Sequence, residues 1–258
     1  MSTPEVLVQH DRDALAASVA ARLVTVIVEA QSDRGHVHLC LAGGGIITRC
    51  LSALRASPAC DSVDWSSVHV WWADERFLPE GDAERNETSA RLALLDSVPL
   101  DPAHVHPMPA EDGRRGVDEA ASHYSQTLLR ESRQDDHAAV PSFDITLLGI
   151  GEDAHVASLF PQSPAVHEAE RWVVGVHGAP KPPAARISLT LRALAASQEI
   201  WLIASGAAKA DAVRLALSPA GSVQVPAAGA RGRERTLLLL DADAASALPA
   251  EMGRPASP

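Results

Sequence analysis

Short apolar runs alternate along the chain with longer segments in which apolar residues recur every three or four positions. Such runs are typical of strands buried on both faces of a sheet, and the longer segments are typical of amphipathic helices. The predicted strands are Glu5–Val8, Val37–Leu41, Val68–Ala73, Asp144–Ile150, Trp172–Val176, Arg186–Leu191, Glu199–Ala204 and Thr236–Leu240. The predicted helices are Asp13–Gln31, Ile46–Ala56, Glu84–Leu95, Gly116–Arg133 and Ala207–Leu217.

This alternation predicts an α/β fold, a doubly wound and mostly parallel sheet with helices on both faces. The chain has 258 residues, a length that one α/β domain commonly reaches. We therefore expect residues 1–248 to form a single domain. Residues 249–258 contain Pro and Gly, and we expect them to be a disordered tail.

Charge and cysteine content narrow the range of partners. The chain has 22 Lys and Arg against 33 Asp and Glu, a net charge of −11, and we expect no nucleic-acid partner. No apolar stretch is long enough to span a bilayer, so no membrane partner is expected. Three cysteines at positions 40, 50 and 60 fit no zinc spacing and indicate reduced thiols. We expect a cytoplasmic monomer or small homo-oligomer.

Candidate chemistry follows the ends of the predicted strands. Four polar or glycine-rich segments each begin where a strand ends, namely Gly43–Gly45, Asp74–Arg76, Gly151–His155 and Ser205–Lys209. In open α/β sheets, ligands bind outside the carboxyl ends of the strands. The sequence therefore predicts that these four distant segments meet at one site.

Two of these segments suit an anion. The turn formed by Gly43, Gly44 and Gly45 exposes backbone N–H groups at the start of a helix, although it can equally be a tight turn. Lys209 falls in the first turn of a helix, where a cation is unfavourable unless an anion lies beside it. A solvated surface lysine is the alternative interpretation of Lys209.

The other two segments suit proton transfer. An imidazole with an ordinary pKa of about 6.5 exchanges protons at neutral pH, so His155 is the candidate general base. Asp153 could orient that ring or the substrate. Asp74 and Arg76 place a carboxylate and a guanidinium after an apolar strand. The alternatives are a hydrogen-bonded loop histidine and a surface ion pair.

Three other patterns do not carry a function from the sequence alone. His36-x-His38 and His104-x-His106 suggest a metal site, but no third ligand is near in the sequence. We therefore expect no bound metal. Gly149-x-Gly151-x-x-Ala154 lacks the acidic partner of a dinucleotide fingerprint. The Gly-x-Ser-x-Gly elbow of serine hydrolases is not found.

Six segments in order resemble the 6-phosphogluconolactonase family. They are Leu41–Gly45 (LAGGG), Ala73–Pro79 (ADERFLP), Asp82–Asn86 (DAERN), Leu147–Pro161 (LLGIGEDAHVASLFP), Pro180–Leu191 (PKPPAARISLTL) and Ser205–Ala210 (SGAAKA). The resemblance covers nearly the whole chain. It implies the doubly wound fold and hydrolysis of 6-phospho-D-glucono-1,5-lactone to 6-phospho-D-gluconate in the oxidative pentose phosphate pathway. It also implies a sugar-phosphate lactone as partner, with no metal and no organic cofactor.

The resemblance also implies roles for single residues. Catalysis would rest on His155, with Asp74 and Arg76 nearby. Phosphate binding would rest on the Gly43–Gly45 turn and Lys209, with Lys181 and Arg186 as further cations. Asp153, Arg85 and Asn86 would have supporting roles. Two loops depart from the family pattern. Gly45-Ile46-Ile47 stands where the family has Ser-Thr-Pro, and Ala154 stands where it has Gly.

Two alternative functions remain open at this point. A glucosamine-6-phosphate deaminase would share Asp74, Asp153 and His155. That family has Tyr at the position of Arg76, Glu at that of Phe160 and no Arg at that of Arg186. The second alternative is a sugar-phosphate binder without turnover, because two loops are altered. Regulators of that kind carry a DNA-binding segment, for which a first strand at residue 5 leaves no room.

Overall fold

The computed structural model describes residues 3–132, 139–249, 252 and 254–255. Most of the predicted disordered tail, residues 249–258, therefore lies outside the described residues. Of its described residues, Arg254–Pro255 form a short strand, and the disorder of the rest stays a prediction. The same holds for Arg133, the predicted end of a helix. Within the described part of the chain, no helix is long and apolar enough to cross a membrane.

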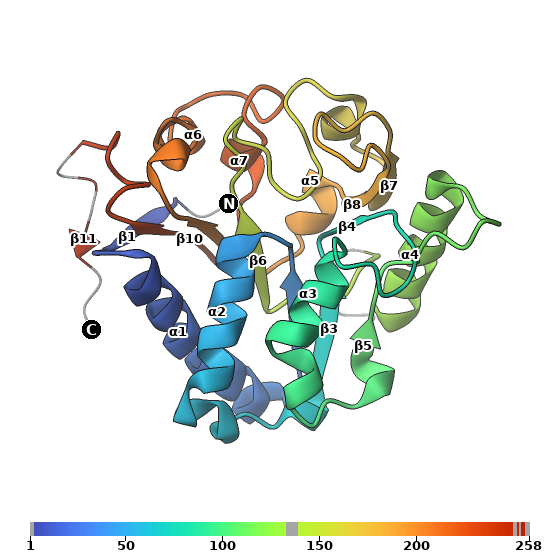
Figure 1. Ribbon diagram of the computed structural model, residues 1–258, viewed down its shortest axis with the longest axis horizontal. Helices are drawn as coiled ribbons and strands as arrows, with labels where there is room; N and C mark the ends of the chain where they lie inside the picture. Colours follow the sequence, from blue (N-terminus) through green and yellow to red (C-terminus); the bar gives the residue numbers. More distant parts are fainter. Residues whose placement is uncertain (1–2, 133–138, 250–251, 253, 256–258) are drawn as a thin grey trace.

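A large parallel sheet forms the centre of the molecule (Figure 1). Its strand order among the described residues is β11-β1-β10-β9-β6-β2-β3-β5. The strands are β1 (Glu5–Gln9), β2 (Val37–Leu41), β3 (Val68–Trp72), β5 (Val105–His106), β6 (Ile145–Gly149), β9 (Glu199–Ala204), β10 (Arg235–Asp241) and β11 (Arg254–Pro255). Every residue of β2 is buried, as its continuous apolar run predicts. The doubly wound α/β prediction is confirmed.

The strand order contains a switch point between β2 and β6. From β2 the chain continues to β3 and β5 on one side, whereas from β6 it continues to β9 and β10 on the other. Because parallel crossovers are right-handed, the connections on the two sides cover opposite faces of the sheet. The crevice at such a switch point is where open α/β sheets bind ligands. The topology alone therefore points to the carboxyl ends of β2 and β6.

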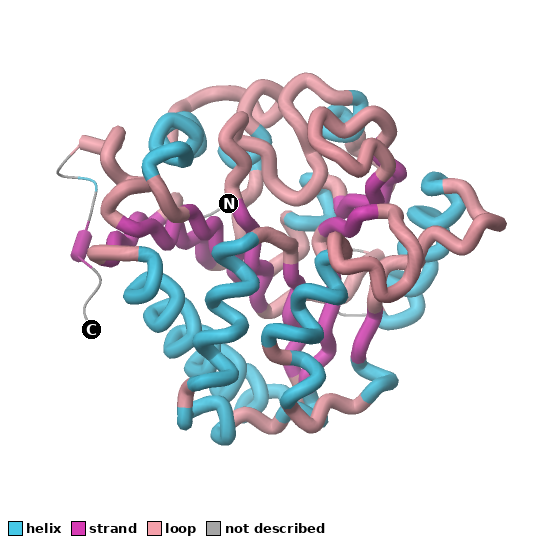
Figure 2. The backbone as a smooth tube through the Cα atoms, viewed as in Figure 1, coloured by secondary structure: helices cyan, strands magenta, loops and turns pink. Residues whose placement is uncertain are grey.

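The helices flank this sheet, and α1, α2 and α3 lie side by side in Figures 1 and 2. Asp11 begins α1, because its carboxylate accepts the N–H groups of Asp13 and Ala14 at 2.8 Å. Gly35 ends it in the left-handed region at φ 75°. The helices are α1 (Arg12–Arg34), α2 (Gly45–Ala56), α3 (Asn86–Ala93), α4 (Val117–Glu131), α5 (Leu191–Leu194), α6 (Ala210–Ala216) and α7 (Pro226–Gly229).

A second, antiparallel sheet lies beside the large one. It has the order β4-β8-β7, with β4 (Asp74–Arg76), β7 (Val173–Val176) and β8 (Arg186–Leu189). Two of these strands, Trp172–Val176 and Arg186–Leu191, were expected, but a second sheet was not. Asp74–Arg76 was expected as a segment after a strand, and it is a strand itself. This pairing brings Arg76 into register with Arg186.

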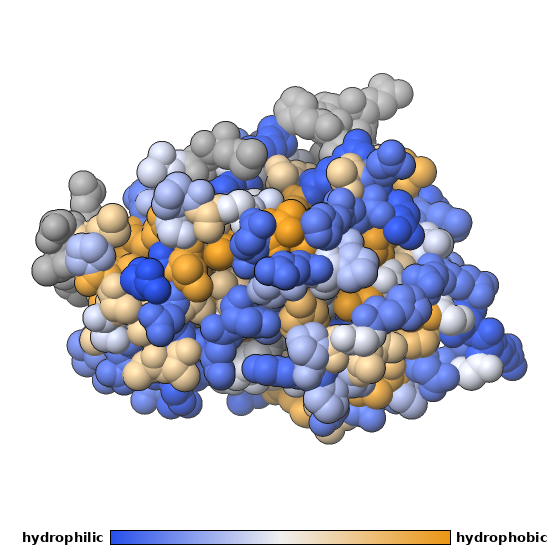
Figure 3. All heavy atoms as spheres, turned by 90° about the horizontal axis from the view of Figure 1, so that it is seen from above, coloured by the Kyte–Doolittle hydropathy of each residue, from blue (hydrophilic) through white to orange (hydrophobic). Residues whose placement is uncertain are grey.

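Two predicted helices begin two or more residues later than expected. The helix expected from Glu84 begins only at Asn86, because the Glu75 carboxylate from β4 accepts the first N–H groups of α3. The helix expected from Ala207 starts with a 3₁₀ turn, Ala207–Lys209, that continues into α6. Seen from above (Figure 3), hydrophobic residues form small separate groups among hydrophilic ones on that face of the molecule.

Candidate active site

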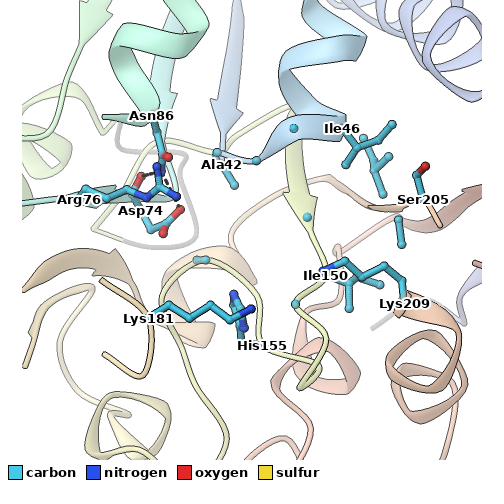
Figure 4. A pocket seen from close by; sticks show the side chains of 18 of the residues that line it. Ala42, Ile46, Asp74, Arg76, Asn86, Ile150, His155, Lys181, Ser205 and Lys209 are labelled. Carbon is cyan, nitrogen blue, oxygen red and sulfur yellow. Dashed lines mark hydrogen bonds between the residues drawn. The ribbon is translucent and has the colours of Figure 1, made fainter. Parts of the chain in front are cut away.

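A pocket of about 700 Å³ lies at the carboxyl ends of the central strands. Its walls include residues from Gly43–Gly45 after β2, Gly149–Gly151 at the end of β6, Ser205 and Lys209 after β9, and Asp74 and Arg76 of β4. The four segments that the sequence singled out are therefore brought together at the switch point. In Figure 4, Asp74, Arg76 and Asn86 lie on one side, and Ser205 and Lys209 lie on the other.

His155 faces this pocket from the loop after β6. Its Nδ1 lies 2.5 Å from Asp153 Oδ1, and its side chain is 18% exposed. Burial alone would raise the pKa of Asp153, but the hydrogen bond and charge of His155 lower it below its usual range. An ionised Asp153 holds Nδ1 as the donor, so Nε2 is the ring nitrogen that can accept a proton. The pair has the geometry of a general base and its orienting carboxylate.

Gly151 allows the histidine ring to lie where it does. A Cβ atom added at Gly151 would stand 2.0 Å from His155 Nδ1 and 2.6 Å from Asp153 Oδ1. The backbone of the loop is closed by Gly151 N–H donating to His155 O at 2.9 Å. Any side chain at position 151 therefore displaces the imidazole and its partner.

Asp74 is held rigidly at the opposite wall. Its Oδ2 accepts the hydroxyl of Ser158 at 2.7 Å, and its backbone O accepts Nδ2 of Asn86 at 2.8 Å. Asp74 is 5% exposed and lines the pocket. Gly43 makes room for this arrangement, since a Cβ there would stand 1.8 Å from Asn86 Oδ1. Asn86 thus connects the glycine turn to the carboxylate.

Two guanidinium groups lie beside Asp74. Arg186 is 6% exposed, and its Nη2 donates to Lys181 O at 2.9 Å while its guanidinium lies 5.7 Å from the Phe160 ring centre. Burial lowers the pKa of Arg186, the charge of Asp74 raises it and the charge of Arg76 lowers it. Arg76 is fixed by a hydrogen bond to Glu84 O. Two like charges facing one carboxylate favour an additional anion in the pocket.

Arg85 is placed elsewhere, in the support below the pocket. Its guanidinium is 1% exposed and donates to Met108 O at 2.8 Å and to Glu87 Oε2 at 3.1 Å. It also lies 3.7 Å from Glu75 Oε2. Arg85 therefore positions β4 and α3, and it is not among the residues lining the pocket.

The glycine turn opens toward the other side of the pocket. Gly44 has φ 114°, a backbone conformation that L side chains rarely adopt, and no side chain caps the N-terminus of α2. Its first-turn N–H groups are thus available to an anion. Within the described residues no hydrogen bond or ion pair holds the ammonium groups of Lys181 and Lys209. Burial lowers the pKa of Lys209, and the charge of Lys181 adds to that effect, whereas the charges of Glu152 and Asp153 oppose it.

Three further pocket residues were missed from the sequence. Arg12 donates from Nε to Ser205 Oγ at 2.9 Å, and Arg49 pairs with Asp13. Arg12 stands between Asp11 and Asp13, and Arg49 lies inside an amphipathic helix, so both look like ordinary surface charge in the sequence. Phe160 packs against His155 with ring centres 4.6 Å apart. The signal that could have found Arg12 is the one used for Lys209, a cation in the first turn after a strand.

The two departures from the family pattern have structural counterparts. The hydroxyl of Thr48 donates to Gly44 O inside α2. It therefore does not replace the hydroxyls that the family pattern has at the positions of Gly45 and Ile46. Ala154 is buried and has φ 64°, the left-handed conformation that glycine adopts without strain. The loop thus keeps the backbone path of a glycine at the cost of local strain.

Comparison with known proteins places the chain in a family. The family model described as glucosamine-6-phosphate isomerases/6-phosphogluconolactonase matches residues 10–239. A 6-phosphogluconolactonase of Streptomyces coelicolor is 58% identical over 257 residues, covering 99% of this chain and 98% of its own. One of Mycobacterium tuberculosis is 48% identical over 241 residues, covering 93% of this chain and 96% of its own.

Solved structures agree with this result. A 6-phosphogluconolactonase from Leishmania guyanensis has a TM-score of 0.81 at 27% identity, covering 96% of this chain and 100% of its own. A monomeric glucosamine-6-phosphate deaminase has a TM-score of 0.74 at 20% identity, covering 94% and 99%, which shows the shared fold alone. The chain belongs to the glucosamine-6-phosphate isomerase/6-phosphogluconolactonase family.

Proposed function

We propose that this protein hydrolyses 6-phospho-D-glucono-1,5-lactone to 6-phospho-D-gluconate in the oxidative pentose phosphate pathway, as a metal-independent lactonase. The main support is that the His155–Asp153 pair lies at a pocket lined by cationic side chains. The chain is also 58% identical to a named 6-phosphogluconolactonase. A lactone is an activated ester, so one general base and one oxyanion donor suffice for its hydrolysis.

In this mechanism His155 Nε2 takes a proton from a water molecule that attacks the lactone carbonyl carbon. The same imidazolium then returns the proton to the ring oxygen as the C–O bond breaks. General acid–base catalysis of this kind contributes about 10²–10⁴-fold. Asp153 keeps the required tautomer through the 2.5 Å contact with Nδ1. No covalent enzyme intermediate is needed.

The cations divide into two groups with different roles. Arg76 and Arg186 lie beside Asp74, where they would stabilise the developing oxyanion; one such donor is typically worth about 3–4 kcal/mol. Lys209 and the glycine turn would bind the phosphate, and Lys181 lines the same pocket (Figure 4). The phosphate then supplies orientation rather than chemistry.

The pocket disfavours the deaminase alternative. Position 160 holds a phenyl ring packed on His155, where that reaction would need a carboxylate to assist ring opening. Arg76 and Arg186, by contrast, suit an oxyanion next to the Asp74 wall. The remaining alternative, a sugar-phosphate binder without turnover, can be distinguished from a lactonase only by an activity assay.

The test is disappearance of freshly generated 6-phosphogluconolactone with and without the protein, at slightly acidic pH where spontaneous hydrolysis is slow. We expect fast loss of the lactone and no ammonia from glucosamine 6-phosphate. His155→Asn should lower kcat by at least about 10²-fold with similar ligand affinity. His123→Asn, an exposed change on α4 outside the pocket, is the matched control. A folded protein that binds 6-phosphogluconate but accelerates neither reaction would refute the proposal.

The cellular location and the oligomeric state do not follow from the catalytic mechanism. The three cysteines are buried and free, which agrees with the prediction of reduced thiols and a cytoplasmic enzyme. The expectation of a monomer or small homo-oligomer stays a prediction, which sedimentation analysis tests directly.

A further inference from the structure

A group of histidines lies along β2, β3 and β5, away from the pocket. His38 and His69 stack with ring centres 4.6 Å apart, and His69 and His104 stack at 3.9 Å. His106 stacks on Trp71 at 3.8 Å. None of these residues is among those that line the candidate active site. The proposed hydrolysis leaves the group without a role.

Within this group, two ring nitrogens face the same point. His69 Nδ1 lies 3.2 Å from His106 Nε2. Glu131, the last residue of α4, brings a carboxylate oxygen to the same place. One ligand atom from each of the three residues lies within 4.8 Å of the other two. From the sequence, His104-x-His106 lacked a nearby third ligand; the fold supplies His69 and Glu131 from 37 and 25 residues away.

We propose that His69, His106 and Glu131 form a binding site for a divalent metal ion of the Zn²⁺ class. Two imidazoles and a carboxylate are a ligand set that Zn²⁺ accepts, with water completing a tetrahedron. Bonds of about 2.0–2.1 Å in a tetrahedron place two nitrogens about 3.3 Å apart. The observed separation of 3.2 Å matches this spacing, so the two nitrogens can bind one ion after a rotation of the rings.

The surroundings hold the two imidazoles ready for the ion. The His106 ring is nearly parallel to Trp71, at 10°, and the backbone O of His106 accepts the Tyr124 hydroxyl at 3.2 Å. His69 is stacked on His104 in the same manner. Glu131 is exposed, so its carboxylate can complete the site from solvent. The metal would tie the end of α4 to β3 and to the edge strand β5.

Binding of the metal requires only that one proton moves within the histidine pair. Two neutral imidazoles each keep one N–H, and the metal takes the place of the proton that now lies between His69 Nδ1 and His106 Nε2. That proton moves to the other nitrogen of the same ring. The ionised carboxylate offsets one of the two metal charges. No redox partner or further reactant is involved.

Titration of the metal-free protein with Zn²⁺ by calorimetry tests the proposal. We expect one Zn²⁺ per chain, bound at least about tenfold more weakly by Glu131→Gln and by His69→Asn. Glu119→Gln, an exposed change on the same helix, and His123→Asn are the matched controls and should bind like the wild type. Zn²⁺ should raise the Tm of the wild type and not of Glu131→Gln. Co²⁺ should give the visible absorption of a four-coordinate ion.

Two outcomes would overturn this inference. One is the absence of Zn²⁺ uptake by the wild type. The other is uptake that survives Glu131→Gln and His69→Asn but is lost in His155→Asn, which would place the ion at the catalytic pair. Because Glu131 is exposed and lies outside the pocket, Glu131→Gln should fold and turn over lactone like the wild type. Loss of metal binding in that variant therefore cannot be attributed to unfolding.

Discussion

Replacing Gly151 by Ala should displace the imidazole of His155, the proposed general base, while leaving the histidine itself in the chain. The new Cβ would stand 2.0 Å from His155 Nδ1, whereas ordinary van der Waals contact begins at 3.4 Å, so the ring must move by about 1.4 Å. A misplacement of about 1 Å at a reacting group can lower the rate about 10²-fold. The Cβ would also crowd Asp153 Oδ1 at 2.6 Å, so the pair cannot relax as a unit toward the carboxylate.

We therefore expect Gly151→Ala to lower kcat for lactone hydrolysis by about 10²-fold while the KM changes little. The matched control is Gly149→Ala in the same pocket, where the nearest atom to the new Cβ is Gly43 O at an ordinary 3.6 Å. That variant should stay within about threefold of the wild type. Steady-state kinetics with freshly generated lactone measure both variants, and a melting curve shows that each is folded.

The double variant sharpens this test. If Gly151→Ala acts by moving His155, it should add no further loss in a His155→Asn background, since residues that act as one unit are not additive. A wild-type kcat for Gly151→Ala would refute the reasoning. So would a full additional loss in the double variant, because the damage would then lie outside the imidazole.

Three further variants test the electrostatics of the site. Lys209→Ala should raise the KM for the phosphorylated lactone about 10–100-fold, the value of a charged hydrogen bond, and equal loss with unphosphorylated gluconolactone would exclude a phosphate role. Asp153→Asn should lower kcat by about 10²-fold through loss of the Nδ1 acceptor, and an unchanged pH–rate profile with unchanged kcat would contradict this. Burial raises the pKa of Glu75 to about 7, against the opposing charge of Arg85, so stability should fall as pH rises from about 4.5 to 7. Glu75→Gln should lack that fall, at most about 3 kcal/mol, in urea unfolding at pH 5 and pH 8; equal pH slopes would contradict the assignment.

The parallel strands could be predicted from the sequence because they are buried on both faces. The predicted ranges Val37–Leu41 and Glu199–Ala204 coincide with β2 and β9. Strand ends then located the glycine turn, the loop of His155 and Lys209 by topology alone. This reasoning needs no contact information, since all parallel strands end at one edge of the sheet.

Other parts of the site depend on pairings that no local pattern encodes. β4 is a polar strand of three residues, and its partner β8 lies more than a hundred residues further along the chain. The meeting of Arg76 with Arg186 therefore could not be derived from periodicity, and only the family resemblance pointed to Arg186. β5 is two residues long and was not among the predicted strands, so the sequence did not indicate the approach of His106 to His69.

Backbone strain in the loop after β6 connects the sequence departure at Ala154 to the proposed catalysis. Ala154, Ala157 and Gln162 all have positive φ, at 64°, 49° and 58°. Each such residue costs about 1–2 kcal/mol, and such strain persists only where the surroundings determine the path of the chain. Here the N–H of Ala227 binds Ala154 O at 3.0 Å, and Ser158 donates to the buried Asp74. Between these two anchors the loop carries His155, which lines the pocket. The alanine at position 154 therefore keeps the left-handed conformation that glycine adopts without strain, and the contacts of Ala154 O and Ser158 hold the loop on that path.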